Sequence, residues 1–93
     1  MLTKYRLFET DEFLKQLKKL GLAQGLVCKK LQTYVYPQLK VQPYVGLNIK
    51  KLVGYSPSTW RYRIGRYRLF YLVDDSELIV SLLTIEARKE AYR

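Results

Sequence analysis

The chain has 93 residues, of which 17 are Lys or Arg and 8 are Asp or Glu, so its formal net charge is +9. This length predicts one domain spanning residues 1–93, and an apolar content of 48% excludes a disordered tail. Such a basic balance favours a polyanionic partner, nucleic acid before an anionic membrane surface.

Residue types exclude several other classes. The chain has no His and a single Cys, Cys28, so neither an internal disulfide nor a zinc site with His ligands is expected. We expect Cys28 to be a small buried residue on a helix. No apolar run approaches the length of a membrane span, and the N-terminus lacks a signal-peptide core, so a cytoplasmic location is the expectation.

The N-terminal half predicts one strand and two helices. Residues 2–8 alternate loosely as a strand does. Thr10 is the expected N-cap of a helix that ends at Gly21. A second helix is expected over residues 23–36, with Pro37 as its stop, and the short link between the two predicts an antiparallel helical hairpin.

The C-terminal half predicts a sheet. Residues 37–57 read as an irregular connection with a short strand or turn near 47–52. A β-hairpin at residues 59–71 and an apolar strand at 77–85, buried on both faces or nearly so, make a three-stranded antiparallel meander. Residues 87–93 read as a short helix or tail. The expected fold is α+β, with helices on one face of one sheet and the other face open.

The hairpin at residues 59–71 carries the strongest functional pattern. With Gly65-Arg66 as a two-residue loop, Arg63 lies opposite Arg68. Alternation then places the apolar residues on a core face, namely Trp60, Tyr62, Ile64, Tyr67, Leu69 and Tyr71. The other face holds Arg61, Arg63 and Arg68. Like charges directly opposite each other destabilise a sheet, so we expect this face to bind an anion.

The permitted chemistry is narrow. Without His there is no Ser-His or Cys-His pair, the carboxylates are too scattered for a two-metal site, and no Gly-rich phosphate loop is present. Arginines around a phosphodiester could stabilise its transition state, and an RNA 2′-hydroxyl could act as nucleophile with no metal or cofactor. Tyr92 or a neighbouring carboxylate would move the protons. At this point the residue types favour plain binding of a nucleic-acid backbone over catalysis, because no full acid–base pair is visible.

The same segments carry a family likeness. The pieces "FETDEFLKQLKKL", "NIKKLVG", "WRYRIGRYRLFYLVDD" and "ARKEAYR", in this order, resemble the RelE/ParE superfamily of toxins from bacterial type II toxin–antitoxin pairs. In the RelE branch this implies a ribosome-dependent endoribonuclease that enters the decoding site and cuts messenger RNA by 2′-hydroxyl attack, without a metal. The resemblance implies these catalytic positions: Arg61, Arg63, Arg68, Arg88 and Tyr92. We expect further RNA contacts from Lys50, Lys51, Arg66, Lys89 and Arg93.

Three other functions stay open. The ParE branch shares the fold but poisons DNA gyrase, and a basic nucleic-acid-binding module or a degenerate toxin would also fit the charge. Many RelE relatives carry a His before the last arginine, where this chain has Ala87. The resemblance also implies a cognate antitoxin, whose disordered segment folds onto the basic surface to form a hetero-oligomer. No membrane partner is expected.

Overall fold

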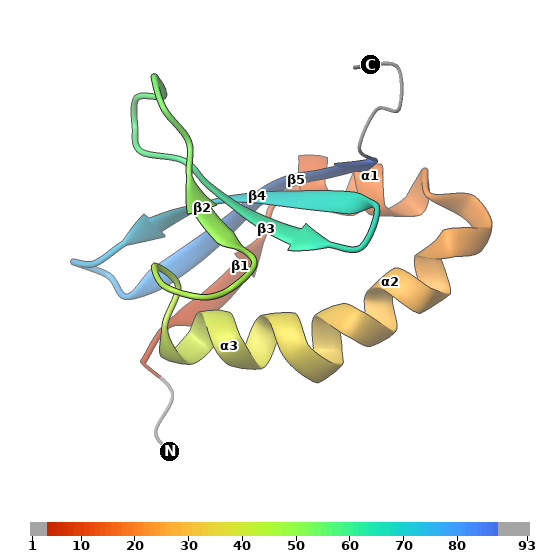
Figure 1. Ribbon diagram of the computed structural model, residues 1–93, viewed down its shortest axis with the longest axis horizontal. Helices are drawn as coiled ribbons and strands as arrows, with labels where there is room; N and C mark the ends of the chain where they lie inside the picture. Colours follow the sequence, from red (N-terminus) through yellow and green to blue (C-terminus); the bar gives the residue numbers. More distant parts are fainter. Residues whose placement is uncertain (1–3, 88–93) are drawn as a thin grey trace.

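A computed structural model describes residues 4–87 and shows a five-stranded mixed sheet with helices on one side (Figure 1). The strand order is β1-β5-β4-β3-β2. The strands are β1 (Arg6–Glu9), β2 (Ile49–Lys51), β3 (Trp60–Ile64), β4 (Tyr67–Asp74) and β5 (Ile79–Ala87). The predicted antiparallel meander is confirmed in β3, β4 and β5, whereas β1 pairs with β5 in parallel. The α+β class is confirmed.

The first helix begins where the sequence predicts. Helix α1 (Asp11–Lys18) follows Thr10, whose hydroxyl oxygen accepts a hydrogen bond from the Phe13 backbone N–H at 3.1 Å. The same hydroxyl donates to the Leu82 carbonyl of β5 at 2.6 Å. The N-cap therefore also fixes the start of α1 against the sheet.

The prediction that Pro37 ends the second helix was wrong. After a short 3₁₀ turn (Gly21–Ala23), the chain turns back into α2 (Gln24–Lys30), a π-helical turn (Leu31–Val35) and α3 (Tyr36–Val41) (Figure 1). Pro37 lies in the first turn of α3. In the wider π turn, the Tyr36 N–H donates to the Leu31 carbonyl. A proline ring normally clashes with the preceding helical turn, and a π turn relieves that conflict.

The core lies between the helices and one face of the sheet. The helices contribute Phe13, Leu17, Val27, Leu31, Val35 and Leu39. The strands contribute Tyr62, Ile64, Leu69, Tyr71, Val80, Leu82 and Ile85. Trp60 and Tyr67, predicted for the core face, are half-buried at its margin. Because the buried residues of every helix meet this one face, the other side of the sheet is uncovered.

Strand β5 departs from simple alternation at one point. Phe70 pairs with Thr84, whereas the next residue, Tyr71, pairs with Leu82, so Leu83 is an extra residue in a β-bulge. Buried positions are Val80 and Leu82 before the bulge and Ile85 after it. The prediction that this strand is buried on both faces or nearly so was wrong, because the positions between these residues are all partly exposed.

The predicted helical tail over residues 87–93 lies, beyond Ala87, outside the described residues. Residue 87 itself ends β5. Within residues 4–87, no helix has the length and apolar character needed to cross a membrane.

Candidate nucleic-acid interface

The hairpin register agrees with the prediction at every pair. Arg63 lies opposite Arg68 and Arg61 opposite Phe70. Gly65 has φ 57°, while Arg66 is not among the positive-φ residues, which is the φ pattern of a type II′ turn. Only glycine adopts this conformation without strain. The turn therefore sets the register that brings the two arginines face to face.

The uncovered side of the sheet carries Arg61, Arg63 and Arg68, and we call it the arginine face. Residues directly opposite across antiparallel strands share a face, so two rows of side chains can be followed over the strands. The first row runs Lys50, Arg61, Phe70 and Thr84. The second runs Arg63, Arg68 and Glu86. Lys50, predicted as an RNA contact, thus lies beside the predicted catalytic arginines.

Neighbouring groups hold two of these arginines. Arg61 Nη1 donates to the Asn48 backbone carbonyl at 3.4 Å. Arg68 Nη2 donates to Glu86 Oε1 at 3.3 Å, and its guanidinium lies 5.7 Å from the centre of the Phe70 ring. Arg63 is exposed, whereas the other two are half-buried. The arginine face therefore presents oriented guanidiniums to solvent, suited to holding a phosphate.

Glu86 is the residue of this face that the sequence did not single out. It lies directly opposite Arg68, and the side chains of Arg68 and Glu86 are 24% and 47% exposed. Alternation counted from Val80 and Leu82 would have turned Glu86 toward the core. The extra residue at Leu83 turns the following side chains to the opposite face, and no residue type at this position indicates a bulge.

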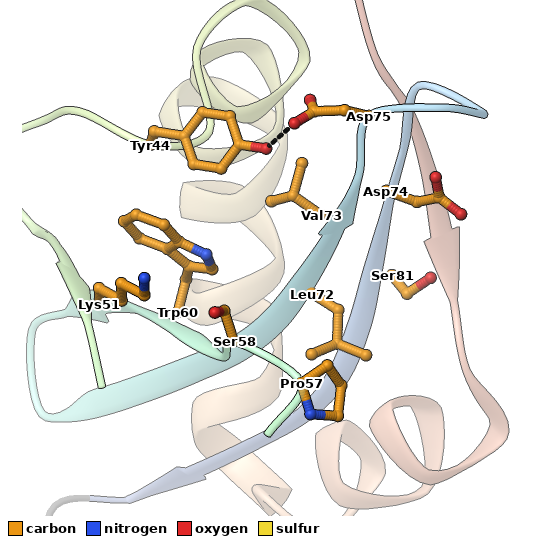
Figure 2. Close-up of a pocket in the computed structure, with 10 residues that line it drawn as sticks. All are labelled: Tyr44, Lys51, Pro57, Ser58, Trp60, Leu72, Val73, Asp74, Asp75 and Ser81. Carbon is orange, nitrogen blue, oxygen red and sulfur yellow. Dashed lines mark hydrogen bonds between the residues drawn. The ribbon is translucent and has the colours of Figure 1, made fainter. Parts of the chain in front are cut away.

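Lys51 does not join its neighbour Lys50. It pairs with Trp60 on the opposite side of the sheet, with Nζ 6.0 Å from the centre of the indole ring. Figure 2 shows both residues lining a separate pocket of about 560 Å³, at the end of the sheet where β3 begins and β4 continues past it. Lys51 is thus placed away from the arginine face.

The far wall of this pocket contains the Asp75 carboxylate, which two tyrosine hydroxyls hold in place. Asp75 accepts hydrogen bonds from the hydroxyls of Tyr44 and Tyr5, both at 2.6 Å (Figure 2 shows the first). These bonds, that from Tyr44 first, lower the pKa of the Asp75 carboxyl below its ordinary value. Tyr44 in turn packs edge-on against Trp60, with ring centres 5.0 Å apart. These two hydrogen bonds and the ring contact stabilise the wall of the pocket.

The remaining predicted residues divide into two groups. Arg66 is exposed at the tip of the hairpin, at the border of the arginine face. Arg88, Lys89, Tyr92 and Arg93 lie outside the described residues. Among residues 4–87, no group of three or more Cys, Asp or Glu side chains could hold a metal ion.

Known proteins match the chain in sequence and in structure. The family model for the ParE toxin of the type II toxin–antitoxin system parDE matches residues 7–92. The isolated RelE toxin of Escherichia coli is 27% identical, with a TM-score of 0.71 over 95% of this chain and 90% of that one. The intact E. coli RelBE toxin–antitoxin complex contains a chain 27% identical, with a TM-score of 0.68 over 92% of this chain and 98% of that one.

A more distant structure has the same fold. A YoeB/ParE toxin from Agrobacterium tumefaciens is 17% identical, with a TM-score of 0.68 over 90% of this chain and 99% of that one. No curated protein sequence matches significantly.

Proposed function

We propose that this chain, which belongs to the ParE toxin family of type II toxin–antitoxin systems, is a ribosome-dependent endoribonuclease of the RelE kind. It cleaves messenger RNA in the ribosomal decoding site, in the cytoplasm, and so stops translation. The RNA 2′-hydroxyl attacks the adjacent phosphodiester, and no metal takes part.

The arginine face is the observation that carries this proposal. Arg61, Arg63 and Arg68 project from neighbouring strands on the uncovered side of the sheet. Guanidiniums bind phosphate bidentately and remain charged at any working pH. Around a scissile phosphate they would stabilise the additional negative charge of the pentacoordinate transition state. The family resemblance adds Arg88 as a further phosphate contact and Tyr92 as a candidate proton carrier.

The family match itself favours a second candidate. Members of the ParE branch share the fold and inhibit DNA gyrase, and the family model that matches residues 7–92 carries the ParE description. Two features support the RelE function instead. The isolated E. coli RelE toxin is 27% identical to this chain. The sequence also keeps the basic and tyrosine set that ParE members generally lack.

A cognate antitoxin is the proposed partner. The E. coli relative was crystallised together with its antitoxin. In this chain, the arginine face offers an antitoxin a basic surface, and Phe70 adds apolar area beside Arg68. A segment carrying acidic and apolar side chains would fold onto that surface and cover the site. The toxin and antitoxin then form a hetero-oligomer.

The decisive experiment is brief induced expression followed by mapping of message ends and of chromosomal breaks in the same cells. We expect new ends inside translated codons, with intact DNA. Arg63→Gln should abolish these ends, whereas Lys18→Gln, which removes one charge from the outer side of α1, should leave them unchanged. DNA breaks with intact messages would instead establish gyrase inhibition.

A further inference from the structure

We propose that Glu86 is the proton acceptor that activates the RNA 2′-hydroxyl, an assignment that rests on the proposed endoribonuclease function. The chain offers few side chains that could act as a general base. The chain has no His and only 8 carboxylates, so a neutral-pH proton acceptor must come from a short set of groups.

Position within the fold removes most of those carboxylates. Asp11 and Glu12 lie in the first turn of α1, where the helix dipole favours them. Glu9 lies on the helix side of the sheet, where its carboxylate accepts a hydrogen bond from the Tyr36 hydroxyl. Three others lie at the β4–β5 turn: Asp74, which caps that turn, Asp75, bonded to two tyrosines, and exposed Glu77. Among the described residues, Glu86 alone lies in a row with the arginines.

The row geometry places Glu86 beside the phosphate site. Arg63, Arg68 and Glu86 occupy directly opposed positions on three neighbouring strands, so their side chains project on the same side. A phosphate held by Arg63 and Arg68 would lie next to the Glu86 carboxylate. The 2′-hydroxyl is attached to the sugar that carries this phosphate, within reach of a carboxylate one strand away.

The Arg68–Glu86 pair keeps the carboxylate available for this role. Its N–O distance is 3.3 Å and the glutamate side chain is 47% exposed, so one guanidinium nitrogen holds one oxygen while the group stays open to solvent. Arg68 thus orients the base and binds the phosphate on which it acts.

The step balances with water as the only added reactant. The 2′-hydroxyl gives its proton to a Glu86 carboxylate oxygen while the 2′-oxygen forms a bond to phosphorus. The bond from phosphorus to the 5′-oxygen breaks, and this oxygen leaves with the electron pair and takes a proton from water. The products are a 2′,3′-cyclic phosphate and a 5′-hydroxyl, and Glu86 returns its proton to solvent.

The test is single-turnover cleavage of a message on purified translating ribosomes from pH 6 to pH 8.5, with wild-type toxin and Glu86→Gln. Glutamine keeps the hydrogen bond to Arg68 but cannot accept the proton. We expect Glu86→Gln to be slower by about 10²–10⁴-fold at neutral pH. Its rate should rise about tenfold per pH unit as hydroxide replaces the missing base, while the wild-type rate stays flat.

Two further variants complete the experiment. Glu86→Asp keeps a carboxylate and should retain a flat pH profile with a modest loss of rate. Glu77→Gln removes a carboxylate from the β4–β5 turn and should match the wild type. A Glu86→Gln rate within threefold of wild type, or a slow rate with a flat pH profile, would reduce Glu86 to a partner of Arg68. Wild-type toxin that leaves ribosome-bound messages intact would instead overturn the proposed function itself.

Discussion

Replacing Arg63 with glutamine should raise stability and abolish cleavage at the same time. Arg63 lies directly opposite Arg68, and a like-charged pair at such a position costs a sheet about 0.2–1 kcal/mol. Glutamine removes this repulsion and keeps most of the side-chain length. Taking about 0.5 kcal/mol for the relief, Tm should rise by roughly 2–4 °C for a domain of this size.

Arg68→Gln is the matched control, because it removes the same repulsion. It also removes the ion pair with Glu86 and the contact with the Phe70 ring. These contribute about 0–1 and 0.5–1 kcal/mol, so its Tm should be unchanged or lower.

Thermal unfolding of both variants in about 0.02 M and 1 M salt checks the argument, since salt screens exposed charges and should shrink the Arg63→Gln gain. A lower Tm for Arg63→Gln at low salt, or a gain that 1 M salt leaves unchanged, would refute the electrostatic reasoning.

Three further predictions concern the scaffold. Tyr71→Phe should cost about 1–3 kcal/mol in urea unfolding, because the buried hydroxyl donates to the Pro43 carbonyl at 2.7 Å and that acceptor would lose its bond. The pKa of Asp75 is lowered in the folded chain, so its stabilising effect is present above about pH 4 and is lost as the pH falls through the lowered pKa. Asp75→Asn should therefore flatten the decline of Tm between pH 5 and pH 2, and a decline as steep as that of the wild type would contradict this. Gly65→Ala should lower stability by about 1–2 kcal/mol in the same urea assay, because its φ of 57° strains any residue with a side chain, and an unchanged midpoint would exclude that strain.

The hairpin could be predicted from sequence because its physics is local. A two-residue turn with glycine first fixes the register, and strict alternation then assigns every side chain to a face. Thr10 was equally readable, since a hydroxyl before an acidic first turn is a typical N-cap. Three arginines of the candidate site followed directly from this alternation.

The features that escaped prediction depend on tertiary structure. A proline generally ends a helix. At Pro37 the helix continues because a π turn precedes it, and Leu31 and Val35 pack this turn into the core. Glu86 reaches the arginine face because an extra residue in β5 is accepted opposite β4. Lys50 and Lys51 look equivalent in sequence, yet their strand sends them to opposite sides.

The position of β5 in the sheet also determines when the arginine face is completed during synthesis of the chain. This last described strand lies between β1 and β4, so β1 has no neighbour until β5 has been synthesised. The bond between Tyr5 and Asp75, 70 residues apart, closes the same long loop. Such non-local pairing forms late in folding. The nascent chain therefore lacks a finished arginine face during most of its own translation, and the surface proposed to bind RNA is completed only after the last described strand has been synthesised.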